Sequence, residues 1–152
     1  MRNRQKGFSL IELLLVVAII LIIAGIAIPS LLRSKMSANE ASAAGSLRTL
    51  NTTSIWYFST YGQYPNALSD LGPISGGTAS STEADLIDSM LATGTKSGYV
   101  FSYTPGAGNQ SYTINADPVS RGTTGQRSFF TDSSGMIRCN TMAAAGVTDN
   151  PI

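Results

Sequence analysis

One long apolar run dominates the N-terminal part of the chain. Residues 13–32 carry no charge, and as a helix rising about 1.5 Å per residue they match the ~30 Å hydrocarbon core of a bilayer. The sequence therefore predicts a helix that can cross a membrane. Glu12 stands at the start of this run, and a carboxylate at mid-bilayer depth costs about 2.5 to 3.5 kcal/mol. We therefore expect Glu12 to have a partner or a function.

Beyond the apolar run, the pattern changes to that of an amphipathic helix. Small and apolar side chains recur at spacings of three and four, which places them on one helical face. This stripe consists of Ala43, Leu47, Leu50, Ser54, Tyr57 and Tyr61. We predict one helix from residue 8 to about residue 61, with a sheet covering the stripe. Pro29 lacks a backbone N–H and interrupts the helical hydrogen bonds near Gly25, so we predict a helix break there, as a bend or local melting.

The rest of the chain predicts a small, turn-rich domain. Gly62 and Tyr64-Pro65 end the long helix, and after a loop rich in Gly and Ser, Thr82 can cap a short helix over residues 82–92. Four strand-like segments then alternate with turns that contain Pro, Gly and Asp, at residues 99–104, 112–116, 128–131 and 136–139. The expected fold is α+β, with the long N-terminal helix packed against a small antiparallel sheet.

A short basic leader precedes the apolar run and ends at Lys6-Gly7-Phe8. Gly7 has no side chain, so an enzyme surface can approach the backbone there closely. Cleavage after Gly7 would create a cation about one helical turn from Glu12, and in a low-dielectric setting these two charges attract, within one chain or between chains. One alternative stays open. Ser9 and Glu12 fit a capping box, in which Glu12 satisfies free N–H groups at the helix start.

These residues resemble a known signature. The segment KGFSLIEL at residues 6–13 is similar to the processing and methylation signature of type IV prepilins and of the pseudopilins of type II secretion. The resemblance implies a pilin-like fold, cleavage between Gly7 and Phe8 by prepilin peptidase, and methylation of the new amine on Phe8. It also implies that Glu12 pairs with the N-terminal amine of a neighbouring subunit, and that the helix can extend under tension at Pro29.

The expected organisation has four parts. Residues 1–7 form the cleaved leader, residues 8–32 the membrane-spanning and later filament-core half of the helix, and residues 33–61 its amphipathic half. Residues 62–152 form a loop region and the sheet, which together with residues 33–61 make a globular head. The slight excess of basic residues before the span favours a cytoplasmic N-terminus and an outward-facing head.

Charge narrows the functional classes. The chain has 10 Lys and Arg against 9 Asp and Glu, and a leader ending at Gly7 would remove three of the basic residues and leave seven. A mature chain with slightly negative side-chain charge argues against a strongly basic nucleic-acid surface, although a local basic patch in a polymer stays open.

Residue types also argue against an enzyme. The chain contains no His and one cysteine, Cys139, which excludes a cysteine-rich zinc site and an intramolecular disulfide. Cys139 shares a strand face with Ile137, so a buried thiol is expected. Four aspartates, Asp85, Asp88, Asp117 and Asp132, lack convincing ligand spacing for a hard cation. The aromatic residues Trp56, Tyr57, Phe58, Tyr61 and Tyr64 are expected to pack against the sheet. We expect no catalytic residue, metal or cofactor.

Three functional hypotheses follow. The first is a type IV pilus subunit that serves adhesion, motility or DNA uptake, and the second is a pseudopilin in a periplasmic secretion filament. Both imply identical or related pilin subunits, a prepilin peptidase and methyltransferase, and an inner-membrane assembly platform as partners. Both also imply an inner-membrane precursor that ends in a surface pilus or a periplasmic pseudopilus. The third is a monomeric single-pass membrane protein whose outer domain binds a partner.

Overall fold

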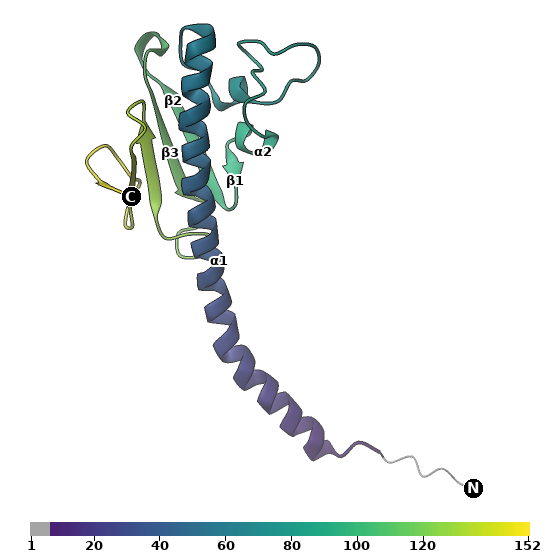
Figure 1. Ribbon diagram of the computed structural model, residues 1–152. Helices are drawn as coiled ribbons and strands as arrows, with labels where there is room; N and C mark the ends of the chain where they lie inside the picture. The colour runs from purple at the N-terminus through teal and green to yellow at the C-terminus, as the bar shows by residue number, and fades with distance from the viewer. Residues whose placement is uncertain (1–6) are drawn as a thin grey trace. The chain divides into compact units, whose positions relative to one another are not determined.

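The computed structural model describes residues 7–152, so the predicted leader lies outside the described residues except for Gly7. The long helix α1 (Leu10–Tyr61) confirms the single helix predicted from the apolar periodicity, and it begins two residues later than expected (Figure 1). The chain divides into two compact units after Ser34. The four-part division at residues 7, 32 and 61 stays a prediction.

The first unit contains the apolar half of α1. Its large side chains are exposed in the isolated chain, with Leu14 at 62%, Leu21 at 65% and Ile26 at 74% of their full accessible area. By length and composition this is the one helix within residues 7–152 that could span a membrane. Helical structure continues through Pro29, although proline removes one backbone N–H from the helical hydrogen bonds. The predicted bend or melting at Pro29 therefore stays a prediction.

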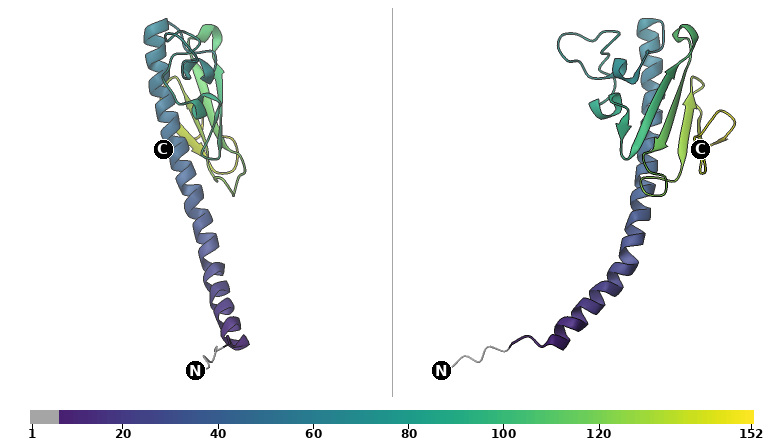
Figure 2. Two further views of the ribbon diagram at one scale, coloured as in Figure 1. Left: turned by 90° about the vertical axis from the view of Figure 1, so that its right-hand side faces the viewer. Right: turned by 180° about the vertical axis from the view of Figure 1, so that it is seen from behind.

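The second unit is built on a six-stranded antiparallel sheet whose strands follow one another in sequence order. The strands are β1 (Thr95–Lys96), β2 (Tyr99–Pro105), β3 (Tyr112–Pro118), β4 (Ser128–Asp132), β5 (Ile137–Asn140) and β6 (Asn150–Pro151). This sheet lies along one flank of residues 35–61 of α1 (Figure 2, left). The predicted α+β architecture is confirmed.

The core of this unit forms between the predicted helix stripe and one face of the sheet. Leu47 and Leu50 are fully buried, and alternate residues of β2 and β3 meet them because successive strand side chains point to opposite faces. The sheet residues in this core are Tyr99, Phe101, Tyr112, Ile114, Ala116, Phe129 and Ile137. Every member of the stripe is buried except Tyr61, which is half-buried at the helix end.

The helix predicted over residues 82–92 is wrong for most of its length. Only α2 (Ser89–Ala92) is helical, and Asp88 rather than Thr82 caps it, by accepting a hydrogen bond from the Leu91 N–H at 3.0 Å. The backbone N–H groups of residues 84–87 instead bond to carbonyls of the short 3-10 helix η1 (Leu68–Leu71) and of Gly72, the residue after it. Asp85 also has φ of 54°, outside the right-handed helical region.

The four predicted strands are present, with ends that differ by one or two residues. The edge strands β1 and β6 were not predicted, because two-residue strands carry no readable alternation of apolar and polar positions. Gly62 ends α1 as expected, with φ of 74°, a conformation that glycine adopts without a side-chain clash.

Candidate functional site

The candidate assembly site lies at the start of α1. Phe8 is 82% exposed, and Glu12 Oε2 accepts a hydrogen bond from the backbone N–H of Ser9 at 2.9 Å. The Leu13 N–H bonds to the Ser9 carbonyl at 3.3 Å and closes the first turn. Glu12 thus makes the capping contact that the Ser-x-x-Glu spacing allows. Its role in pairing with an amine stays a prediction.

Gly7 lies immediately before this turn, in open space. A Cβ atom placed on Gly7 would meet no atom of residues 7–152 within 4 Å. The fold of the chain therefore does not require glycine at this position. If glycine is required here, the requirement arises when an enzyme approaches the backbone.

A second group of polar residues joins α1 to the sheet inside the head. Asn51 lies in α1 and is buried, and its Nδ2 donates to Thr131 Oγ1 at 2.9 Å and to the Gly135 carbonyl at 3.2 Å. Its Oδ1 accepts from the Tyr112 hydroxyl at 3.0 Å. Burial and the neighbouring Tyr64 raise the pKa of Tyr112 to about 12, so the hydroxyl stays protonated as a donor.

Glu40 forms the other polar link between α1 and the sheet region. Its Oε1 accepts hydrogen bonds from the backbone N–H groups of Gln126 at 2.8 Å and Arg127 at 3.0 Å, and its Oε2 lies 2.8 Å from Arg127 Nε. Burial alone would raise the pKa of the Glu40 carboxyl. The two backbone bonds and the guanidinium outweigh that effect and hold the pKa below its usual range.

Sequence reasoning missed both links, although a signal was present. Glu40 and Asn51 are polar residues at spacings that continue the apolar stripe, three residues before Ala43 and four residues after Leu47. A polar residue on a buried helical face requires hydrogen-bond partners. The sequence could therefore have predicted two buried polar contacts, but not the partners that supply them.

The aromatic residues at the end of α1 pack as expected, with one exception. Tyr57 is buried and its ring lies 4.6 Å from that of Tyr61, while Tyr64 contacts Tyr112 edge to face at 4.8 Å. Trp56 is 67% exposed, so the prediction that it packs against the sheet is wrong. It sits one position before Tyr57, and adjacent helical residues point about 100° apart.

Cys139 is less buried than its strand pattern predicted. Ile137 on the same face is buried, whereas Cys139 is half-buried at the margin of the core. Its cross-strand neighbours are Phe129 on β4 and Asn150 on the two-residue edge strand β6. So short an edge leaves one side of the thiol partly uncovered.

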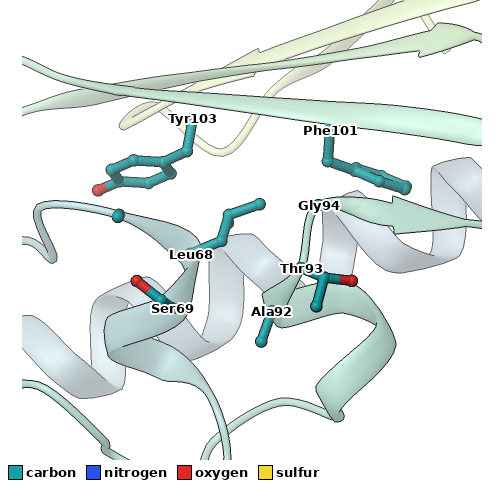
Figure 3. Close-up of a pocket in the computed structure, with 8 residues that line it drawn as sticks. Leu68, Ser69, Ala92, Thr93, Gly94, Phe101 and Tyr103 are labelled. Atoms are coloured by element: carbon teal, nitrogen blue, oxygen red, sulfur yellow. The ribbon is translucent and has the colours of Figure 1, made fainter.

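A shallow hollow of about 250 Å³ lies between η1, α2 and β2. Figure 3 shows Phe101 and Tyr103 extending from β2 on either side of Leu68, with Ser69 on η1 and Thr93 directly after α2. The Tyr103 hydroxyl is buried and has no partner among the described residues, and burial raises its pKa. Because that hydroxyl is sealed from solvent, a molecule in the hollow cannot reach it.

The acidic side chains of the described residues do not gather into a metal site. Residues 7–152 contain no group of three or more His, Cys, Asp or Glu side chains placed to hold a metal ion. Asp88 caps α2 and pairs with Lys96 Nζ at 2.7 Å, and Asp132 accepts hydrogen bonds from Ser134 within its turn.

Comparison with known proteins identifies the N-terminal segment. Residues 2–28 match the model of the prokaryotic N-terminal methylation motif. The chain is 38% identical over 69 residues to the type IV major pilin protein PilA of Myxococcus xanthus, covering 45% of this chain and 31% of that protein. It is 58% identical over 40 residues to the type IV wide pilus major component PilA4 of Thermus thermophilus, covering 26% of this chain and 30% of that protein.

The matched segments span about a third of the length of these curated relatives. The N-terminal part of the chain thus carries the prokaryotic N-terminal methylation motif and is similar to two type IV pilins, which are structural subunits rather than enzymes, and the chain has a pilin-like α+β fold, as the resemblance of residues 6–13 predicted.

Proposed function

We propose that this chain is a structural subunit of a type IV pilus. The precursor resides in the inner membrane through the apolar half of α1, with its N-terminus in the cytoplasm. A prepilin peptidase cleaves between Gly7 and Phe8, the new amine on Phe8 is methylated, and an inner-membrane platform adds the subunit to a homopolymeric filament. The surface filament serves adhesion, motility or DNA uptake.

The exposed apolar half of α1 is the observation that carries this proposal. Leu10, Leu13, Leu21 and Ile22 are each at least 60% exposed, while the head buries its core without them. An exposed apolar surface of this length requires either lipid or other apolar helices around it. A membrane precursor that becomes the core of a polymer supplies both environments in turn.

Glu12 supports polymerisation over simple anchoring. A monomeric anchor uses this carboxylate only for the capping contact with Ser9, at the edge of a span where burial in lipid is costly. In a polymer, the amine created at Phe8 offers a charge partner from a neighbouring chain, and pairing offsets part of the cost of burying both ions. The contact with the Ser9 N–H holds Glu12 at the end of the helix where such an amine arrives.

Mass spectrometry of sheared surface filaments tests the proposal. We expect an intact chain that begins at Phe8 and carries one additional methyl group. Recovery of this mass only from cell envelopes, with none in sheared filaments, would favour the pseudopilin alternative. An unprocessed chain that still contains residues 1–7 and stays monomeric in detergent would favour the monomeric membrane protein.

The pilus is preferred to the pseudopilus because both similar proteins are named as major pilus components. The head adds a weakly charged surface rich in Ser, Thr and Gly, with 12% charged residues in the whole chain. Such a surface suits a coat in which many copies of one subunit lie side by side, because charge repulsion between like subunits is small.

A further inference from the structure

The C-terminal loop, residues 141–149, is ordered almost entirely by side-chain hydrogen bonds. It joins β5 to β6 and contains no helix or strand (Figure 1, yellow). Ala145 is buried, and its carbonyl accepts a hydrogen bond from Asn115 Nδ2 at 2.8 Å. Asn115 alternates with the buried Ile114 and Ala116 of β3, so it lies on the sheet face away from the core.

Asp149 closes the loop from its C-terminal end. Its Oδ2 accepts from the Gly146 N–H at 2.8 Å, and its Oδ1 accepts from Asn140 Nδ2 at 2.9 Å. Asn140 Oδ1 accepts in turn from the N–H groups of Met142 and Ala143, at 2.9 and 3.1 Å. The two ends of the loop are therefore joined through one carboxylate and one amide.

Arg121 holds the same loop from a different part of the fold. It lies in the turn between β3 and β4, and its Nη1 and Nη2 donate to the carbonyls of Thr141 and Ala143 at 3.0 and 3.1 Å. The same two nitrogens donate to the Gln126 carbonyl and to the hydroxyl of the buried Ser128. A planar guanidinium can serve four acceptors in this way, whereas an ammonium presents a single nitrogen.

We propose that Arg121 and Asp149 are positioning residues that hold the C-terminal loop in one conformation without any covalent cross-link. The only cysteine of the chain lies outside the loop, so no disulfide can close it. Held in this way, the loop turns two apolar side chains toward solvent, Met142 at 90% and Val147 at 60% exposure. This role follows from the head alone and does not depend on filament assembly.

Hydrogen exchange on the full chain in detergent micelles tests the role. In Arg121→Lys and in Asp149→Asn, we expect the amides of Met142, Ala143 and Gly146 to exchange about tenfold faster, because the lost hydrogen bonds lower the free energy of local opening. In Asp149→Asn, at least one amide donor is forced to face another donor, because the new side chain has one acceptor atom instead of two. The amide of Ile114 in β3 should exchange at the wild-type rate.

Matched controls are Arg48→Lys and Asp85→Asn, which make the same chemical changes at exposed positions outside the loop. Faster exchange that is confined to the loop, and absent from both controls, supports the proposal. Loop amides that exchange at the wild-type rate in both variants overturn the proposal. Loop amides that are already unprotected in the wild-type chain also overturn it. If Arg121→Lys accelerates exchange throughout the head, Asp149→Asn alone decides the outcome, by the same criteria.

Discussion

Glu40 and Arg127 are joined twice, once through the backbone and once through the side chains. The Arg127 N–H lies 3.0 Å from Glu40 Oε1, and its Nε lies 2.8 Å from Glu40 Oε2. The Glu40 side chain is 10% exposed, whereas that of Arg127 is 42% exposed. The carboxylate therefore loses more solvent than its partner, and its hydrogen bonds have to replace that water.

Replacement of Glu40 by Ala should destabilise the head by about 1 to 3 kcal/mol, because it leaves the N–H groups of Gln126 and Arg127 without their acceptor. Chemical unfolding of the full chain in detergent, followed by tyrosine fluorescence, measures this change. Glu83→Ala is the matched control, since Glu83 is only half-buried and its carboxylate accepts hydrogen bonds from Ser75 alone, rather than from a distant part of the fold. An equal loss in both variants would contradict a specific role for Glu40.

The contribution of Glu40 should also depend on pH. Its pKa in the folded chain is lowered from 4.5, so folding favours the ionised form. The stability that it adds is therefore present above pH 4.5 and is lost as the pH falls through the folded pKa. We expect the free-energy difference between wild type and Glu40→Gln to shrink between pH 7 and pH 3. A difference that stays constant over this range would contradict the prediction.

Asn51 should stabilise the head through its hydrogen bonds rather than through apolar packing. Asn51→Leu removes the acceptor of the Tyr112 hydroxyl and the donor to Thr131, so we expect a loss of about 1 to 3 kcal/mol despite the added apolar volume. The double variant Asn51→Leu with Tyr112→Phe should recover part of this loss, because it also removes the stranded hydroxyl. A double-mutant cycle from urea unfolding measures the coupling, and strictly additive losses would contradict it.

The long helix and the four main strands follow directly from periodicity. The stripe from Ala43 to Tyr57 repeats at helical spacing, and residues 112–116 alternate at strand spacing, so each pattern selects one structure and one buried face. The helix predicted over residues 82–92 is mostly absent for a physical reason. Its apolar spacing fits a helix, but its backbone donors bond to carbonyls around η1, and this tertiary contact outweighs local preference.

In the candidate site too, contacts between residues close in sequence could be predicted, and contacts between residues far apart in sequence could not. The capping contact of Glu12 with Ser9 is local, and the spacing of the two residues predicts it. Arg121 lies 20 residues or more from the loop carbonyls that it contacts, and Glu40 lies 86 residues from Gln126. Only the topology of the sheet brings such residues together, so no short motif could have identified them.

Gly7 replaced by Leu should block processing but leave the fold intact. A Cβ atom at this position meets no atom of the described residues within 4 Å, so the free energy of unfolding should be unchanged. The bulkier residue prevents close approach of the peptidase to the backbone, and the precursor should accumulate in the membrane. Intact mass measurement of the membrane fraction checks this outcome. Normal yields of a chain that begins at Phe8 would contradict it.

Glu12 replaced by Gln separates the two roles that this carboxylate can play. A glutamine oxygen can still accept the hydrogen bond from the Ser9 N–H, but it carries no charge to pair with an amine. Glu12→Val loses both interactions. If the ion pair governs assembly, both variants should be processed normally and yield few filaments, because the amine on Phe8 would be buried without a counter-charge.

The capping hypothesis predicts a different outcome for the two Glu12 variants. If capping alone gives Glu12 its role, Glu12→Gln should form filaments at wild-type yield and only Glu12→Val should fail. The measurement is the amount of subunit in sheared filaments relative to processed subunit in the membrane. Ser9→Ala is the matched control, because it keeps the backbone N–H that Glu12 binds and removes only a side chain beside it. Wild-type assembly of Ser9→Ala together with failure of Glu12→Gln would assign the role of Glu12 to its charge.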